Sequence, residues 1–314
     1  MRLPNPFYEI LQGLKTVHLR SYLNLANYLW GFTRWQWNAR FAPVQVIANR
    51  PAKATIILLS YKRPRNIQPM VRSLLKASCV QRVIVSNNNP NLRLEDWLQL
   101  RDRRLHVMNQ PVRCFPGFRL ELARQDGGEY FLSFDDDVFL FPWQVDQLFS
   151  RLLETPSVPH GIYGDLFVEE SLRTRYPASQ HRHGWLGGLM NIDAPVHVLN
   201  RGYAFSRSHL QEVSRLGSLL DIDVGAMPIA DDVLLSSAGT ALPRCVKLGR
   251  ILTCPSSARP GVAVSKQKDF RRERARLYCS LRKLKPLPDG EAFPAVENSI
   301  GLRRWMRKNL KQRV

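Results

Sequence analysis

The sequence lacks the long apolar runs and glycine-rich loops that mark several large protein classes. It has no apolar run of about 18 residues, so no transmembrane helix is expected. Its N-terminus shows neither the apolar core nor the cleavage site of a signal peptide. No Gly-x-Gly-x-x-Gly follows the first β-like run, and no Gly-Lys-Ser/Thr loop occurs. These absences disfavour a Rossmann-type dehydrogenase and a P-loop ATPase, and they predict a cytoplasmic or peripheral membrane protein.

Cysteine is scarce, and its spacing suits neither a zinc ribbon nor a disulfide framework. The five cysteines are Cys79, Cys114, Cys245, Cys254 and Cys279, with no Cys-x-x-Cys pair. Zinc ribbons and small disulfide-rich domains need paired, closely spaced cysteines. The pattern favours a reducing compartment, although it leaves room for one or two bridges.

Acidic residues are also in short supply. Lys and Arg total 46 against 26 Asp and Glu, a formal charge of +20, and much of the excess lies in Lys268–Lys285 and Leu302–Val314. Such a charge suits an anionic partner, whether nucleic acid, a phosphate-bearing substrate, an acidic polysaccharide or an anionic membrane surface. Nucleic acid is disfavoured among these, because no nucleic-acid-binding motif is recognisable and the charge is mostly terminal.

Residues 1–50 form a segment of their own, with apolar residues at helical spacing. Its central aromatic and basic residues are Trp30, Arg34, Trp35, Trp37 and Arg40. An aromatic, basic helix of this kind can lie in a membrane interface. The alternative, which we favour, is a helix packed on the main domain or on a partner subunit. Pro43 and Pro51 bracket the linker that follows.

From residue 53 onwards, short apolar runs alternate with amphipathic helical patterns. The predicted strands are Thr55–Leu59, Arg82–Ser86, Leu105–Met108, Tyr130–Phe134, Gly161–Val168 and Val246–Leu252, with further apolar segments at His197–Leu199 and Tyr203–Phe205. The predicted helices are Ile67–Leu75, Leu94–Leu100, Phe118–Ala123, Val145–Leu152 and one opened by Ala230–Leu235. Arg173–Met190 is expected to be a long loop. This alternation predicts an α/β fold with a mostly parallel, Rossmann-like sheet flanked by helices.

Three consecutive acids, Asp135, Asp136 and Asp137, follow the predicted strand Tyr130–Phe134. Adjacent carboxylates repel one another, so a fold that buries them must supply positive charge, and a hard divalent cation is the usual source. The alternative is a solvated turn in which Asp137 serves as a helix cap. Ligands of parallel sheets sit beyond the carboxyl ends of the strands. Arg63 and Asn88 also follow strands, so we expect them to converge with the acids on one crevice.

Two further candidate sites are weaker. His181 and His183 could bind metal, but two histidines without a third ligand of matched spacing are more often solvated. Asp231 and Asp232 stand in the first turn of a predicted helix, where acids also complement the helix dipole.

The ordered motifs of this chain resemble the exostosin-type glycosyltransferase domain, glycosyltransferase family 64, which has a GT-A fold. They are Ser-Tyr-Lys-Arg from Ser60, Val-Ile-Val-Ser-Asn-Asn-Asn from Val83, Phe-Asp-Asp-Asp from Phe134, Ala-Asp-Asp-Val from Ala230 and the helix Arg276–Leu284. The resemblance covers Ala54 to Leu284. We therefore expect an N-terminal helical extension at 1–50, a GT-A domain at 51–285 and a basic tail at 286–314.

The resemblance implies a metal-dependent glycosyltransferase, hexosyl or N-acetylhexosaminyl, that moves a sugar from a UDP-sugar to a glycan or glycolipid hydroxyl with retention of configuration. Mn²⁺, or Mg²⁺, would be the cofactor. Ser60, Arg63 and Asn88 would contact the uracil and ribose side of UDP, and Arg119 would approach the nucleotide. The donor sugar, the acceptor and the oligomeric state stay open.

The resemblance also divides the acids between donor and metal. Asp135 and Asp136 would bind ribose and sugar hydroxyls, and Asp137 would reach the metal, with Asp135 as its second ligand. The spacing permits this division, because residues i and i+2 of an extended turn face one side.

Asp231 and Asp232 would face the donor sugar and the acceptor, and Arg276 would lie over the diphosphate. The alternative is a basic protein that binds nucleic acid or a membrane surface and has an inactive transferase-like domain.

Overall fold

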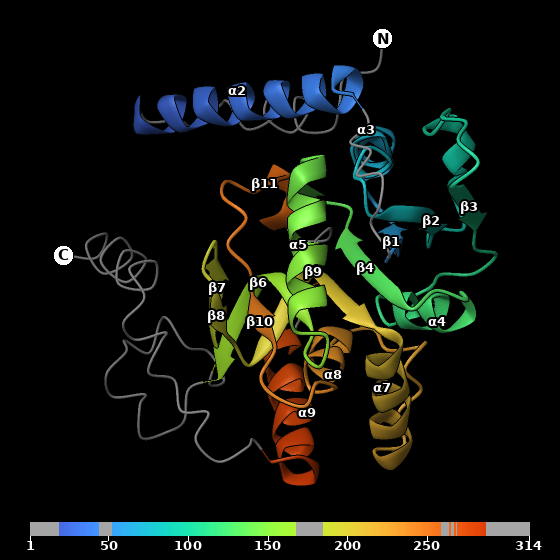
Figure 1. Ribbon diagram of the computed structural model, residues 1–314, viewed down its shortest axis with the longest axis vertical. Coiled ribbons are helices and arrows are strands. Elements are labelled where there is room, and N and C mark those ends of the chain that lie inside the picture. Colours follow the sequence, from blue (N-terminus) through green and yellow to red (C-terminus); the bar gives the residue numbers. More distant parts are fainter. Residues whose placement is uncertain are drawn as a thin grey trace.

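The computed structural model describes residues 19–43, 52–167, 185–258, 264, 267 and 269–286. A nine-stranded sheet forms the centre of this part of the chain, in the order β3-β2-β1-β4-β9-β6-β10-β8, with β7 beside β6 (Figure 1). The strands are β1 (Ala54–Ser60), β2 (Val80–Asn87), β3 (Leu105–Asn109), β4 (Tyr130–Asp135), β6 (His160–Phe167), β7 (Trp185–Met190), β8 (Ala194–Pro195), β9 (Val198–Ser206) and β10 (Arg244–Cys245). A separate two-stranded sheet joins β5 (Val138–Phe139) to β11 (Leu252–Thr253).

Most of the helices pack against this sheet, and the first of them packs on the second helix and on β11. The helices are α2 (Leu19–Phe41), α3 (Pro64–Leu74), α4 (Phe118–Gln125), α5 (Pro142–Glu154), α7 (Arg207–Leu219), α8 (Asp231–Ser236) and α9 (Phe270–Leu284). The predictions for His181, His183, the first eighteen residues and the basic tail lie outside the described residues.

The register of β1 brings the predicted site residues to one edge of the sheet. β1 pairs in parallel with β2 and β4, so Ser60 stands opposite Asn87, and Leu59 stands opposite Asp135. β9 then pairs antiparallel with β4 and with β6. The predicted Rossmann-like α/β class, with helices flanking the sheet and a helix ahead of it, is confirmed.

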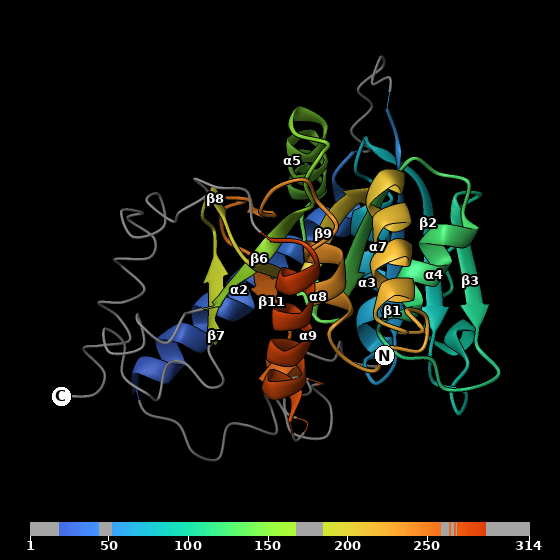
Figure 2. The same cartoon turned by 90° about the horizontal axis from the view of Figure 1, so that it is seen from below.

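Alternate residues of β1 serve two cores, one on each face of the sheet. Ile56 and Leu58 belong to the core that contains α3 and α5, whereas Ile57 and Leu59 belong to the core that contains α4, α7 and α9. Figure 2 shows α7, α8 and α9 towards the viewer and α2 behind them. Burying each such side chain contributes about 1.5–3 kcal/mol. A continuous apolar run is therefore what a strand covered on both faces requires.

The helix α2 is joined to the first core by its aromatic side chains. Phe32 and Trp35 are fully buried, and both rings contact Phe139, with centroids 5.1 and 4.8 Å away. The indole Nε1 of Trp35 donates to the carbonyl oxygen of Leu140 at 2.8 Å. The described part of the N-terminal segment therefore packs behind the turn that carries the three acids.

Trp35→Ala is expected to lower the free energy of unfolding by about 3–5 kcal/mol, because it opens a cavity and removes one of the two hydrogen-bond donors, Trp35 and Ser73, of the Leu140 carbonyl. Trp37→Ala is the matched control. Trp37 is 67% exposed, so its loss should change stability by about 0.5 kcal/mol or less. Denaturant unfolding of both variants is the measurement. Equal effects would contradict this packing of α2.

Two local predictions were wrong. Leu94–Leu100 forms only a 3₁₀ turn, Leu94–Asp96, and the N–H of Leu94 donates to the Asn109 side chain. Of the predicted strand Val246–Leu252, only Leu252 lies in a strand, the short β11. The Lys247 and Gly249 N–H groups donate to the side chains of Asp193 and Asn191, and Gly249 has a φ of +74°. Side-chain acceptors have replaced a neighbouring strand as partners of this backbone.

Two other segments are more regular than predicted. His197–Leu199 and Tyr203–Phe205 belong largely to one strand, β9. Trp185–Met190, the last part of the predicted loop, is β7 and pairs antiparallel with β6. Residues 168–184 lie outside the described residues.

Candidate functional site

Arg63 connects the carboxyl end of β1 to the acid triplet. Pro64 occupies the first turn of α3, and the residue before a proline is kept out of the helical region, so Arg63 sits at φ −127° and ends the β1 turn. Its Nη1 lies 2.5 Å from Asp136 Oδ1, and its Nη2 lies 3.3 Å from Asp137 Oδ2. Its Nε donates to Ser256 Oγ at 2.9 Å. One buried cation therefore holds two of the three acids.

Asp137 has one oxygen that no described residue satisfies. The residue is 6% exposed, and Oδ1 is buried without a hydrogen-bond partner among the described residues. Burial, with the nearby charge of Asp135, raises the pKa of Asp137 to about 6. An unsatisfied buried carboxylate oxygen costs free energy that a structural residue would avoid. It is the feature of the site that calls for a ligand.

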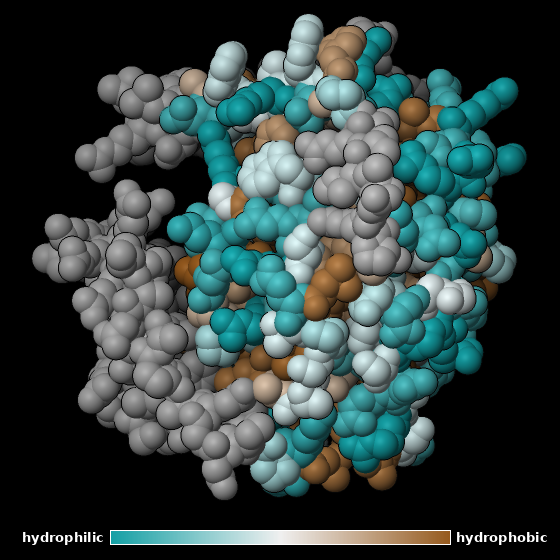
Figure 3. Space-filling view, viewed as in Figure 1, coloured by the Kyte–Doolittle hydropathy of each residue, from teal (hydrophilic) through white to brown (hydrophobic). Residues whose placement is uncertain are grey.

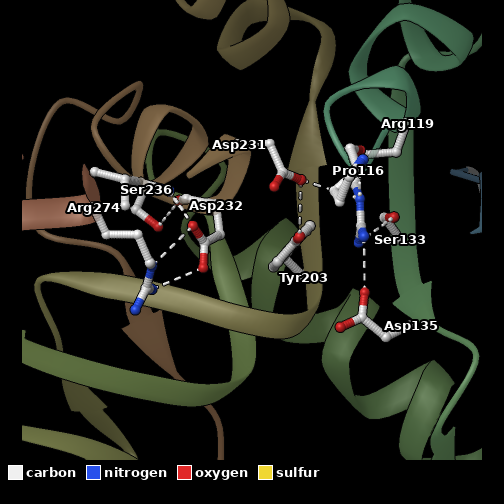
Figure 4. Close-up of polar contacts among 10 residues, drawn as sticks. Pro116, Arg119, Ser133, Asp135, Tyr203, Asp231, Asp232, Ser236 and Arg274 are labelled. Carbon is white, nitrogen blue, oxygen red and sulfur yellow. Dashed lines mark hydrogen bonds and ion pairs between the residues drawn. The ribbon is translucent and has the colours of Figure 1, made fainter. Parts of the chain in front are cut away.

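Arg119 bridges the acid triplet and the second pair of acids (Figure 4). Its Nη2 donates to Asp135 Oδ1 at 2.8 Å, and its Nε lies 3.2 Å from Asp231 Oδ2. Tyr203 supports the same group, with its hydroxyl 3.5 Å from Asp231 Oδ2 and its ring beneath the guanidinium. Burial raises the pKa of Asp231, and the charge of Arg119 opposes that rise. Two motifs almost a hundred residues apart thus share one cation.

Asp232 is held by a different arginine. Arg274, from α9, donates Nη2 to Asp232 Oδ2 at 2.7 Å and Nη1 to Asp165 Oδ2 at 2.9 Å (Figure 4 draws the first of these). Burial raises the pKa of Asp232 to about 6, and Arg274 opposes that rise. Ala230, directly before these acids, has a φ of +71°, a strained conformation for a residue with a Cβ. Ala230 is the N-cap residue of α8, so both acids lie in the first turn of that helix.

The structure does not bring Arg276 to the acids. Its side chain is 67% exposed and pairs with Glu273 at 3.0 Å. The buried cation is Arg274, which shares the inward face of α9 with Tyr278 and Leu281. The spacing of these three residues, i, i+4 and i+7, was present in the sequence and would have singled out Arg274.

Arg274→Met is expected to lower the free energy of unfolding by about 3–5 kcal/mol, because two buried carboxylates lose their shared cation. Arg276→Met is the control on the same helix. Its exposed pair with Glu273 is expected to contribute about 0.5 kcal/mol or less. Thermal and denaturant unfolding of the two variants test this. Similar losses of stability in the two variants would show that Arg274 does not stabilise the buried carboxylates of Asp165 and Asp232.

Ser60 and Asn88 lie at the same edge but beneath the surface. Ser60 is 1% exposed, and its Oγ has no partner among the described residues. Asn88 donates its N–H to the Ser60 carbonyl at 2.8 Å, and its side-chain oxygen accepts from Ser86. The structure thus brings these two residues together near Arg63, as expected from the strand ends.

Sequence reasoning missed Arg201. It interrupts β9 with a φ of +62°, at an irregularity in the pairing of β6 with β9. Its guanidinium lies 5.1 Å from the centroid of the Tyr163 ring, and its charge acts on Asp137 by lowering the pKa of that carboxyl. The only sequence signal was an Arg-Gly pair between two apolar runs.

Aromatic and basic side chains were also missed at the end of β1. Two cations lie near the Tyr61 ring. The Arg113 guanidinium is 5.1 Å from the ring centroid, and the Lys62 ammonium is 5.3 Å from it. Arg113 also lies 5.1 Å from the Phe115 ring centroid. The backbone N–H of Tyr61 donates to Asp136 at 3.3 Å, which ties this cluster to the acids.

The acid triplet suits a hard cation whose remaining ligands come from the substrate. Within the described ranges, no three His, Cys, Asp or Glu side chains are grouped closely enough to enclose a metal ion. Mg²⁺ and similar ions at phosphate sites are usually held by one or two carboxylates together with phosphate oxygens and water. Asp137, with its free Oδ1, and the part-exposed Asp135 are the residues that fit this arrangement.

No protein-family model and no curated protein matches this chain. Among solved structures, CMP:2-keto-3-deoxy-manno-octonic acid synthetase complexed with CTP is 17% identical over 52% of this chain and 78% of its own, with a TM-score of 0.35. GalNAc-T7 with UDP, GalNAc and Mn²⁺ is 9% identical over 64% of this chain and 43% of its own, with a TM-score of 0.45. The chain thus spans less than half of GalNAc-T7. These partial likenesses of the backbone assign no function to any side chain, and the exostosin assignment stays a resemblance of motifs.

Proposed function

We propose that this protein is a metal-assisted transferase that uses a nucleotide sugar as its donor. The observation that carries the proposal is the unpartnered, buried Oδ1 of Asp137, placed beside Arg63 at the carboxyl ends of β1 and β4. A site of this kind suits an ion that arrives with a diphosphate, because the diphosphate supplies the ligands that the chain does not.

Asp137 and Asp135 would hold the ion, which when bound acts as a Lewis acid on the leaving diphosphate. Arg63 keeps Asp136 and Asp137 in place through its two nitrogens. Arg201 is near enough to Asp137 for its charge to lower the pKa of that carboxyl, and this charge would also attract phosphate oxygens. Arginine keeps its charge at all relevant pH values and matches phosphate geometry. Arg63 and Arg201 would stabilise the negative charge that develops on the leaving group, each by roughly 3 kcal/mol in a water-poor cleft.

The Tyr61 cluster fits the base of the nucleotide. The Tyr61 ring, with the cations of Lys62 and Arg113 near it, would offer an aromatic contact for the base at the end of β1. Ser60, which precedes Tyr61, and Asn88 are buried at the same strand ends, and the Ser60 hydroxyl has no hydrogen-bond partner among the described residues. Uracil is the base that the motif resemblance favours, and UDP-sugars are therefore the first donors to test.

Asp231 and Asp232 would face the sugar and the acceptor. Asp231 is held by Arg119 and Tyr203, so it is positioned to accept hydrogen bonds from donor hydroxyls. The raised pKa of Asp232, about 6, suits a group that orients or accepts the proton of an acceptor hydroxyl. Retention of configuration, a glycan or glycolipid acceptor and membership of glycosyltransferase family 64 remain proposals that rest on the resemblance alone.

The test is a panel of UDP-, GDP- and CMP-activated sugars, each assayed for nucleotide release with and without Mn²⁺ or Mg²⁺. We expect release from one class of donor, dependent on the ion. Thermal shift with the free nucleotides gives a second readout that needs no acceptor. If no nucleotide raises the melting temperature with either ion, the proposal is wrong. The ion pairs of Arg63, Arg119 and Arg274 would then be a structural network.

A further inference from the structure

The outward face of α2 carries three exposed aromatic side chains, two of which are the most exposed large apolar side chains of the described residues. Trp30 is 70% exposed, Trp37 67% and Phe41 56%. With Arg34 they stand at i, i+4, i+7 and i+11, which places all four on one side of a helix. We call these four residues the aromatic stripe. In Figure 1, α2 runs along the upper edge of the molecule, and pale and brown side chains project from that edge in Figure 3.

The packing of α2 fixes the direction of the aromatic stripe. Phe32, Trp35 and Ala39 on the opposite side are at most 2% exposed and belong to the fold. Tyr28 stacks on Phe32 with ring centroids 6.1 Å apart. Because rolling the helix inward would break these contacts, the stripe has no route into the core. Two tryptophans held outward by a rigid helix form a surface that is suited to a ligand outside this fold.

The charge beside the aromatic stripe is of one sign. Arg34 lies within it and Arg40 beside it, and both are exposed, with the Arg40 guanidinium 5.4 Å from the Phe41 ring centroid. No Asp or Glu occurs in α2. Arg250, also exposed, donates to the Asn27 carbonyl at 2.8 Å and adds a further cation near Trp30.

From this we infer that the aromatic stripe docks the protein on an anionic lipid surface. Tryptophan rings prefer the boundary between lipid headgroups and acyl chains, where one edge is dry and the other is wet. Arginines beside them meet anionic headgroups. Among the helices in the described ranges, none combines the length and apolarity needed to cross a bilayer. The docked helix therefore lies in the plane of the surface. This inference does not depend on the proposed transferase activity.

The test is sedimentation of the full chain with vesicles of phosphatidylcholine alone or mixed with phosphatidylserine. We expect binding to the mixed vesicles. The double variant Trp30→Ala/Trp37→Ala should bind more than about tenfold more weakly, since both rings lose their apolar burial. Arg34→Gln and Arg40→Gln should each weaken binding about fivefold and reduce its salt dependence. Leu219→Ala/Leu284→Ala is the control, because it removes two exposed apolar side chains from other helices.

A second measurement keeps the inference testable if the alanine variant unfolds. Brominated lipid should quench the tryptophan fluorescence of the wild-type chain, and Trp30→Phe/Trp37→Phe should lose most of that quenching. Unchanged vesicle binding by the alanine variant would overturn the inference, because other cations of this +20 chain would then carry the binding. Absence of binding to mixed vesicles would also overturn it. So would a lipid-free dimer that the same substitutions dissolve, because the stripe would then join two copies of the chain.

Discussion

Asp137→Asn is expected to abolish ion-dependent donor use while leaving the protein at least as stable as the wild type. The substitution removes the charge that would hold the ion, so turnover and nucleotide affinity in Mn²⁺ should fall by at least about 100-fold. In the absence of metal, the free energy of unfolding at pH 7 should stay the same or rise by up to about 2 kcal/mol. If Asp137 were a purely structural acid, Asp137→Asn would instead lower the free energy of unfolding and leave turnover unchanged.

The gain in stability expected for Asp137→Asn should depend on pH. Burial raises the pKa of Asp137 to about 6 from an ordinary value of 3.8, so the ionised carboxyl opposes folding at pH 7. The advantage of Asp137→Asn should therefore be largest at neutral pH and should fade as the pH falls through 6 towards 3.8. Denaturant unfolding across this range, with a chelator present, is the measurement.

Asp146→Asn is the matched control for Asp137→Asn. Asp146 accepts hydrogen bonds from the N–H and hydroxyl of Ser78 and from the N–H of Cys79. Losing that charge should lower the free energy of unfolding by about 1–3 kcal/mol and leave turnover of the folded protein unchanged. If both variants lost stability equally and kept activity, Asp137 would be a structural residue.

Arg119→Met is expected to lower the free energy of unfolding by about 3–5 kcal/mol and to remove activity. Arg119 is 4% exposed and separates Asp135 from Asp231, so its loss leaves two carboxylates close together without a cation. Arg82→Met is the control. Arg82 also contacts a buried carboxylate, Asp126, but its own side chain is 42% exposed, so water can replace it at a cost of about 1 kcal/mol.

A second substitution separates the two effects of Arg119→Met. In the variant that also carries Asp231→Asn, repulsion between the acids is relieved, and stability should recover by about 1–3 kcal/mol. Activity should not recover, because the double variant lacks both Arg119 and the carboxylate of Asp231, the group proposed to orient the donor sugar. Recovery of activity with stability would mean that Arg119 acts only through folding. Urea unfolding and donor hydrolysis, measured on the same preparations, distinguish these outcomes.

Strand-end residues could be predicted because they obey local rules. A continuous apolar run such as Thr55–Leu59 has to be covered on both faces, and parallel strands bring their carboxyl ends to one edge. This was enough to expect Arg63 and Asp137 in one place. Helix spacing alone would also have identified Arg274, since it shares a face with Tyr278 and Leu281, but the motif resemblance drew attention to Arg276 instead.

Contacts between distant segments could not be predicted. The sequence does not indicate which aspartate forms an ion pair with which arginine, because these pairs depend on backbone positions that only the packed sheet defines. Arg119 joins Asp135 to Asp231, and Asp165 shares Arg274 with Asp232, through pairings between residues up to 112 positions apart. The same holds for Arg201, whose left-handed conformation arises at an irregularity between β6 and β9.

The sequence by itself therefore determined the α/β class, the edge of the sheet where the acids gather and the positive charge of the whole chain. These follow from hydrophobic periodicity and composition, which act locally. Only the tertiary structure decided that Asp135, Asp136, Asp231 and Asp232 are each matched by a buried arginine, while one oxygen of Asp137 has no partner among the described residues. That difference depends on burial and on distances of a few ångströms, which are set only when the strands and helices have packed together.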